Sequence, residues 1–529
     1  MKSITSIKLI TLTSIFFLLA DNYAFFQNTL KVYPLDAHHI GFLASLGVVL
    51  VAFTLFIFTL VSSRWTTKPL LILVLIISSL ANYFMNTYHI VIDDTMIRNI
   101  LQTDIKESLD LFSLKQLSYL IFLGLLPTYI VYKTPLKYRG FRTELIAKLK
   151  TLLITLVIIV ASIFLFSQFY TSFAREHKPL RYSVNPLYWI YSSGKYISKT
   201  FESAPKPLQK LGTDATITPH SPHKLVILVV GEATRADHFS LNGYEKETNP
   251  LLKQEAIINF SQMYSCGTAT ATSVPCMFSI YPRKTYSYKK GRSTENVLDV
   301  LRHTDKVAIL WRDNNSDSKG VALRVPYENY KSNKNNTICT EGECRDIGML
   351  VGLDTFIQTH KDKDILIVLH QMGNHGPAYY KRYTKSFERF TPVCKTNQLE
   401  DCTKEEISNA YDNAIIYTDA FLSKTIHYLQ RYTNTYDTAM FYLADHGESL
   451  GENGIYLHGM PYFIAPQAQK HTAALMWFGE NFSQQAMVQR VKKHKDEPYS
   501  QDNLFHTLLG LFQVKTTLYD PTLDVLHAP

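Results

Sequence analysis

Residues 224–232 read KLVILVVGE, a short aliphatic run that ends on a glycine and a carboxylate. Similar apolar runs follow at 307–310, 365–369 and 439–443. Continuous runs of this length are typical of buried strands in a largely parallel sheet, with helices such as 404–430 packed between them. The sequence therefore predicts an α/β domain. Ligands bind such sheets beyond the carboxyl ends of the strands, so we expect the functional site there.

Three of these runs lead into side chains that bind metals or exchange protons. The first ends at Glu232, the third continues into His370 and His375, and the fourth into Asp445 and His446. Carboxylates and imidazoles together form a ligand set that zinc accepts. Any one of them alone would be explained equally well as a structural histidine or a helix cap. Their joint occurrence at strand ends favours a metal centre.

The loop 266–276 reads CGTATATSVPC and is rich in threonine. On its own it would be a polar turn closed by a disulfide. A hydroxyl becomes a strong nucleophile when a metal or a base lowers its pKa. Beside the predicted metal ligands, the loop is therefore interpreted as a nucleophile loop.

The amino-terminal part of the chain is predicted to span a membrane. A helix needs about 20 apolar residues to cross a bilayer, and the first such stretch could equally be a signal peptide. Basic residues gather in the loops that follow the second and fourth stretches, which places those loops in the cytoplasm and everything after residue 171 in the periplasm of a bacterial inner-membrane protein. The five stretches lie near 9–28, 40–62, 69–88, 116–132 and 151–170.

All six cysteines lie in the predicted outer domain, which fits an oxidising compartment. They form three close pairs in the sequence, and this favours pairing between neighbours, although six cysteines allow 15 connectivities. A cysteine-rich metal site is the alternative, but no pair has the two-residue spacing of a zinc knuckle. The residues are Cys266, Cys276, Cys339, Cys344, Cys394 and Cys402.

Composition divides the chain into three parts, with a transmembrane domain at 1–172, an interfacial helix and linker at 173–222, and a catalytic domain at 223–529. The aromatic and basic stretch 175–199 is typical of a helix at headgroup level or of a linker helix packed on the soluble domain. Residues 201–222 are rich in Pro, Ser and Thr and are predicted to be the linker. The net charge of +9 suits a phosphate-bearing partner or an anionic membrane surface. We expect a monomer that binds no nucleic acid.

Six runs of the outer domain carry a resemblance to a known family. They are VVGE at 229–232, SCGTAT at 265–270, SVPCMF at 273–278, WRDNNSDSKG at 311–320, HQMGNHGP at 370–377 and DHGESLGENG at 445–454. Runs this long, in this order, resemble the phosphoethanolamine transferases that act on lipid A, including the mobile colistin resistance enzymes. The resemblance extends over essentially the whole chain. It implies five membrane helices joined to a periplasmic domain of the alkaline phosphatase and sulfatase fold.

The resemblance also implies roles for particular residues. Thr270 would be the nucleophile that accepts the phosphoethanolamine group. One tightly bound zinc ion would be held by Glu232, Thr270, Asp445 and His446. Phosphatidylethanolamine would be the donor and a lipid A phosphate the acceptor, and the added ethanolamine would lower surface negative charge and give polymyxin resistance.

Further positions match the family outside the predicted metal ligands. His375 and His458 are similar to a second histidine pair, which contacts the transferred phosphate or a second zinc ion, and Lys319 and Asn315 are similar to positions that bind phosphoethanolamine. One position departs from the family, which commonly has threonine directly after the zinc-binding glutamate where this chain has Ala233.

Three other functions compete with this interpretation. A hydrolase of the same fold is the first, although neither Cys266 nor Cys276 begins the Cys-x-Pro-x-Arg motif that sulfatases mature. A glycerol phosphate transferase would differ only in the headgroup that it moves. A non-enzymatic membrane sensor with a degenerate domain is the third, and the presence of every expected ligand position argues against it.

Overall fold

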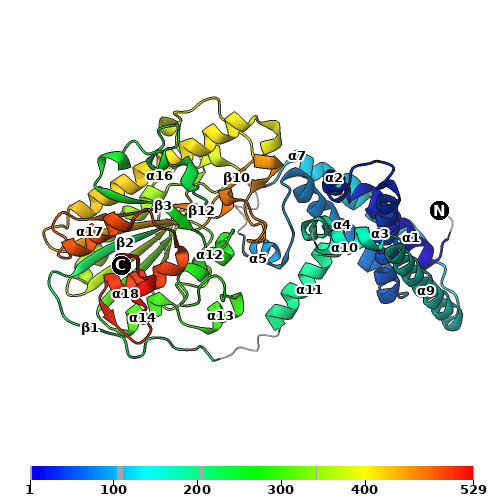
Figure 1. Ribbon diagram of the computed structural model, residues 1–529, viewed down its shortest axis with the longest axis horizontal. Coiled ribbons are helices and arrows are strands. Elements are labelled where there is room, and N and C mark those ends of the chain that lie inside the picture. The colour runs from blue at the N-terminus through cyan, green and yellow to red at the C-terminus, as the bar shows by residue number, and fades with distance from the viewer. Residues whose placement is uncertain (1–2, 104–110, 176, 202–206, 341, 528–529) are drawn as a thin grey trace. The chain divides into compact units, whose positions relative to one another are not determined.

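The computed structural model describes residues 3–103, 111–175, 177–201, 207–340 and 342–527 (Figure 1). It divides into two compact units, one of Met1–Ile97 with Phe112–Ser198 and one of Arg98–Leu111 with Lys199–Pro529. The first unit is helical and the second is an α/β domain. The predicted fold class is therefore confirmed.

Four helical segments in the described part of the first unit are long and apolar enough to cross a membrane. A fifth span results if the bent pair α1 (Ser6–Ala20) and α2 (Tyr23–Val32), which meet at 56°, counts as one. The four are α3 (Ile40–Val61), α4 (Thr67–Thr87), the continuous segment α7–η1–α8 (Leu114–Lys133) and α9 (Phe141–Leu165).

The first predicted span, 9–28, is interrupted in the structure at Asp21 and Asn22. The Asn22 amide donates to the carbonyl of Phe17 at 2.9 Å, and its carbonyl accepts the backbone N–H of Asn185 at 3.1 Å. Buried polar groups need such partners. Asn82 in α4 likewise donates to Asp21 Oδ1 at 2.9 Å, so the two side chains hold a bend where hydropathy alone predicts a continuous helix.

The last span begins ten residues earlier than predicted, at Phe141 instead of 151. The additional turns carry basic residues, and one of them, Lys148, donates to the backbone carbonyl of Ser62. A long basic side chain can run along apolar surface and place its charge at a polar group, so the helix continues through a stretch that hydropathy excludes.

The predicted interfacial segment folds into the 3-10 helix η2 (Lys178–Ser183) and the helix α11 (Leu187–Phe201). Whether α11 lies at headgroup level stays a prediction, as do the domain boundaries at 172 and 222. Of the predicted linker, residues 202–206 lie outside the described part of the chain.

An eight-stranded sheet forms the centre of the second unit. The four predicted strands are its middle, where each is buried along its length, and β12 alone among the eight runs antiparallel to its neighbours. The order is β13 (Tyr499–Ser500), β3 (Ile257–Tyr264), β12 (His471–Phe478), β9 (Asp437–Ala444), β2 (Lys224–Gly231), β8 (Asp364–His370), β4 (Val307–Asp313) and β5 (Tyr327–Asn329).

Helices cover both faces of this sheet (Figure 1). On one face, alternate β2 residues such as Val226 and Leu228 share a core with α14 (Val297–His303) and α18 (Leu504–Leu511). On the other face lies α16 (Lys404–Gln430), which has the predicted bounds. It begins at a capping box, in which Thr403 and Glu406 accept each other's backbone N–H.

The six cysteines form three bridges between neighbours in the sequence, Cys266–Cys276, Cys339–Cys344 and Cys394–Cys402. The first spans the predicted nucleophile loop, the second joins the two-stranded ribbon of β6 (Cys339–Thr340) and β7 (Glu343–Cys344), and the third closes the loop before α16. All three lie in the α/β unit, as the cysteine distribution predicts.

The bridge before α16 predicts a measurable loss of stability. Replacing Cys394 and Cys402 together with serine removes a cross-link over eight residues. The chain-entropy relation then predicts a loss of about 2–3 kcal/mol, seen as a lower urea midpoint of the α/β unit. Thr396→Ser, inside the same loop, keeps the bridge and should unfold like the wild type. An unchanged midpoint in the double variant would show that this loop does not limit unfolding.

Candidate functional site

The site lies where the central strands end together. β2 and β9 pair in parallel with Gly231 opposite Ala444, and β8 ends beside β2 at His370. Glu232 and Asp445 are the next residues of their strands. The predicted convergence at the carboxyl edge therefore exists, and register alone brings the two carboxylates together.

Glu232, Asp445 and His446, which we call the metal group, are completely buried. His446 Nε2 lies 3.3 Å from Glu232 Oε1 and 3.4 Å from Asp445 Oδ2. Neither of these two oxygens has a hydrogen-bond partner within the described chain. Ligands bound at about 2.0–2.2 Å to a tetrahedral zinc lie roughly 3.3–3.6 Å from one another. The spacing and the unpaired oxygens therefore fit a zinc ion.

Electrostatics also favours a cation at this position. Burial, and then the neighbouring Asp445 carboxylate, raise the pKa of Glu232. Two buried carboxylates in contact remain ionised together only if a positive charge lies between them. A divalent ion held by the metal group would supply that charge.

Thr270 is the first residue of α12 (Thr270–Met277) and lies against the metal group. Its hydroxyl Oγ1 is 3.1 Å from Glu232 Oε2 and 3.2 Å from His446 Nε2. Thr268 is directed elsewhere and donates to the carbonyl of Met460. Thr270 is thus the threonine of the loop that reaches the predicted ligands, and the amino end of a helix favours negative charge on its oxygen.

The second predicted histidine pair adjoins the metal group. The ring centres of His375 and His458 are 5.8 Å apart, and that of His458 is 4.3 Å from the ring of His446. His446, Glu448 and His458 also have ligand atoms within 4.8 Å of one another. The geometry therefore permits either a phosphate contact or a second ion, the two alternatives left by the sequence.

The two predicted headgroup-binding residues differ in their surroundings. The Asn315 amide donates to Glu232 Oε2 at 2.8 Å and to the carbonyl of Gln371 at 2.7 Å, so it orients a predicted metal ligand. Lys319 Nζ donates to the carbonyl of Ser316 at 3.0 Å and lines a cavity of about 570 Å³. Contact of either residue with phosphoethanolamine stays a prediction.

Glu448 is a site residue that the sequence reasoning did not single out. It is completely buried, accepts a hydrogen bond from the Tyr379 hydroxyl at 3.1 Å, and pairs with His458 Nδ1 at 3.0 Å. Burial raises the pKa of Glu448 to about 7, although His446 opposes the shift. Its position three residues after Asp445, inside the run DHGESLGENG, was the available signal.

Gln501 is a second supporting residue that the sequence pattern does not indicate. Its amide donates to the carbonyls of Ala444 and Asp445 at 2.7 and 2.8 Å, and its oxygen accepts from the Ser273 hydroxyl and the Cys266 N–H, both at 2.6 Å. One side chain thereby joins the end of β9 to the loop that carries Thr270. No local sequence pattern marks such a residue.

Comparison with known proteins gives one consistent result. Residues 224–514 match the family model described as "Sulfatase", and residues 50–201 match that described as "Phosphoethanolamine transferase EptA/EptB". The chain is 44% identical to the phosphatidylethanolamine transferase Mcr-2 of Escherichia coli over 524 residues, which cover 97% of this chain and 96% of that protein. It is 40% identical to the phosphoethanolamine transferase EptA of E. coli K12 over 516 residues, covering 96% and 94%.

A solved structure is similar over the whole chain. It is the integral membrane protein lipooligosaccharide phosphoethanolamine transferase A of Neisseria meningitidis, which matches with a TM-score of 0.95 and 34% identity. The match covers 100% of this chain and 99% of that one.

The metal group predicts how substitutions change bound zinc. Replacing His446 with alanine removes a ligand, so the purified protein should contain about one zinc ion fewer per chain than the wild type, measured by mass spectrometry of the metal. His370→Ala is the matched control, because His370 is equally buried at the same edge but bonds Asp313 Oδ2 at 2.9 Å. Zinc lost from the His370 variant and kept in the His446 variant would refute the assignment.

Proposed function

Because the chain belongs to the lipid A phosphoethanolamine transferases of the Mcr and EptA type, in the sulfatase and alkaline phosphatase superfamily, we propose that Thr270 carries the phosphoethanolamine group between two lipids. The chain is a phosphoethanolamine transferase that modifies lipid A, an integral membrane protein with a periplasmic catalytic domain. The contact of the Thr270 hydroxyl with Glu232 and His446 is the observation that carries the proposal.

Phosphatidylethanolamine is the donor in this proposal, and a lipid A phosphate is the acceptor. The name of Mcr-2, phosphatidylethanolamine transferase, contains this lipid. Both substrates are membrane lipids, which accounts for a catalytic domain covalently joined to membrane-spanning helices.

Glu232, Asp445 and His446 would hold the zinc, with Thr270 as the fourth ligand. When bound there, zinc would lower the pKa of the Thr270 hydroxyl and neutralise the two buried carboxylates. Asn315 keeps the Glu232 carboxylate in place through the 2.8 Å hydrogen bond. The amino end of α12 adds its favourable field at the threonine oxygen.

The first step transfers the headgroup to the enzyme. Thr270 Oγ1 releases its proton to solvent and attacks the donor phosphorus, the bond from phosphorus to the glycerol oxygen breaks, and diacylglycerol leaves. His458, whose Nδ1 bonds Glu448, supplies the proton that the leaving oxygen needs. Positive charge on His375 and Lys319 stabilises the oxygens of the five-coordinate phosphorus.

The second step transfers the group to lipid A. A phosphate oxygen of lipid A attacks the phosphothreonine phosphorus, and the bond to Thr270 breaks and regenerates its oxygen. The group added to lipid A carries an ethanolamine cation, which offsets part of the negative charge of the phosphate. Lipid A then attracts cationic peptides less, and weaker binding of polymyxin follows.

The covalent role proposed for Thr270 predicts that its replacement abolishes transfer, whereas replacement of another threonine in the loop does not. Thr270→Ala should abolish transfer to lipid A, measured by mass spectrometry of lipid A, because no oxygen remains to carry the headgroup. Removal of a nucleophile elsewhere leaves on the order of 10³–10⁴-fold catalysis over water, so slow donor hydrolysis can persist without transfer. Thr270→Ser should keep part of the activity.

A trapped intermediate tests the same step directly. Wild-type protein given phosphatidylethanolamine without acceptor should gain one phosphoethanolamine group on the peptide that contains Thr270. An adduct on Thr268 or Thr272 would move the nucleophile. Efficient transfer by the Thr270→Ala variant would exclude the covalent route, and a glycerol phosphate adduct would assign the donor to a different lipid.

Glu448 is predicted to act by positioning His458. Glu448→Gln keeps an oxygen for the Tyr379 hydroxyl but removes the charge beside His458 Nδ1. Such supporting partners are worth about 10–100-fold in activity, so transfer should fall by that factor while the fold persists. Glu452→Gln is the control, since Glu452 lies on the same segment but pairs with Arg235. Equal activity of the two variants would remove Glu448 from the mechanism.

A further inference from the structure

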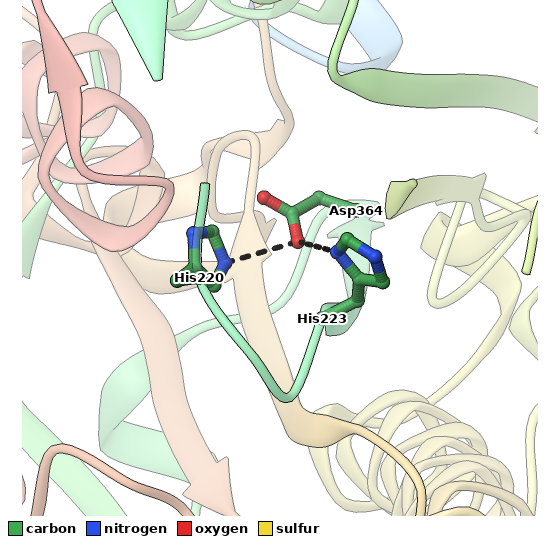
Figure 2. A group of neighbouring side chains, drawn as sticks. All are labelled: His220, His223 and Asp364. Carbon is green, nitrogen blue, oxygen red and sulfur yellow. Dashed lines mark ion pairs between the residues drawn. The ribbon is translucent and has the colours of Figure 1, made fainter. Parts of the chain in front are cut away.

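A second group of metal-binding side chains lies at the opposite edge of the same sheet (Figure 2). His220 and His223 belong to the segment that leads into β2, and Asp364 begins β8. Because β2 runs from Lys224 to Gly231, at about 3.3 Å per residue, this group is roughly 23 Å from the metal group. We call these three residues the linker group.

The ligand atoms of the linker group lie close enough together to share one ion. His220 Nε2 lies 3.1 Å from Asp364 Oδ1, and His223 Nδ1 lies 3.4 Å from the same oxygen. In Figure 2 the carboxylate stands between the two rings. All three ligand atoms lie within 4.8 Å of one another. Ligands of a tetrahedral zinc are separated by roughly 3.3–3.6 Å, so the two histidine–carboxylate separations are close to those of zinc ligands.

One nitrogen of the group lacks a hydrogen bond. His223 Nδ1 is buried, although its side chain is 39% exposed, and it has no hydrogen-bond partner within the described chain. Its 3.4 Å approach to Asp364 Oδ1 does not have hydrogen-bond geometry. A buried polar atom without a partner is costly, and coordination of an ion would satisfy it.

The two neighbours of His220 Nε2 place opposite requirements on its protonation, and this also favours a bound ion. Its Nε2 faces Asp364 Oδ1 at 3.1 Å and the ammonium of Lys224 at 3.0 Å. A protonated nitrogen would suit the carboxylate and oppose Lys224, whereas an unprotonated one would suit Lys224 and oppose the carboxylate. An ion bound by the nitrogen lone pair and the carboxylate would displace Lys224 from this nitrogen, and Lys224 would keep the Gln513 oxygen at 3.3 Å as its acceptor.

We propose that His220, His223 and Asp364 form a structural zinc site that fastens the segment entering β2 to the start of β8. Two imidazoles and one carboxylate are a common zinc ligand set, and the partly exposed His220 and His223 leave room for water as the fourth ligand. The Asp364 carboxylate is already fixed by the Lys224 N–H at 2.8 Å. The site binds zinc without taking part in transfer.

Metal content of the full-length protein tests the proposal. His220→Ala and His223→Ala should each contain about one zinc ion fewer per chain than the wild type, and both should retain transfer activity, since the metal group is far away. The matched control is His494→Ala, because His494 pairs with Glu497 at 2.7 Å but has no second histidine in its group. It should keep the wild-type zinc content.

Zinc-dependent melting isolates the linker group from the catalytic ion. A Glu232→Gln/Asp445→Asn/His446→Ala background replaces the whole metal group and one member of the His446, Glu448 and His458 cluster, and this protein, stripped with a chelator, should still rise in melting temperature when zinc is added. Adding His223→Ala should abolish that rise. The result does not depend on Thr270 chemistry, so failure here leaves the proposed function intact.

Asp364→Asn is a second variant, which tests the zinc site if a histidine variant does not fold. It keeps an oxygen for the Lys224 N–H but removes the anionic ligand, so it should fold and lose the same zinc ion. Full zinc content in folded Asp364→Asn or His223→Ala protein would overturn the proposal and leave an ion-pair cluster only.

Discussion

The arrangement of the candidate site depends on two buried carboxylates at adjacent strand ends. Glu232 and Asp445 are forced together by the parallel register of β2 and β9, and neither can leave the interior. Their repulsion has to be offset by a cation and by hydrogen bonds. Asn315 donates to Glu232, and the backbone N–H groups of Ala233 and His446 donate to Asp445. These donors stabilise negative charge on the two carboxylates.

The proposed nucleophile, Thr270, is positioned by contacts from distant parts of the chain. Gln501 joins the end of β9 to the loop before α12, and the Cys266–Cys276 bridge closes that loop. Rigid support of this kind keeps a reacting atom within a fraction of an ångström of its required position. It explains why Thr270, and not its neighbours, meets Glu232 and His446.

The sequence was informative where one local pattern decided the structure. The run at 225–230 is apolar on both faces, which only a central strand tolerates, and α16 has its predicted bounds because Thr403 and Glu406 form a cap. β12 was not predicted, since its alanine, leucine and methionine also suit a helix and tertiary pairing decides. The bend at Asp21 and Asn22 likewise depends on a residue far away in the sequence, because the Asn22 side-chain oxygen accepts the backbone N–H of Asn185.

The residues of the candidate site can be divided in the same way, into those that a local sequence pattern indicates and those that only the fold brings together. Strand-end position identified the metal group, because parallel strands deliver their last residues to one edge. Glu448 and Gln501 act through contacts that only the folded chain creates, and the linker group depends on the register of β2 with β8. Residues that support a site are harder to find than residues that form it, since their role is set by three-dimensional neighbours.

The bridge across the nucleophile loop has a consequence for biosynthesis. A disulfide persists only outside the reducing cytosol, so the loop that presents Thr270 is completed after the domain has crossed the membrane. Newly made chains would stay inert beside the phospholipids of the cytoplasmic leaflet and mature only on the side where lipid A is modified. Oxidative folding would thus couple export of the domain to completion of this loop.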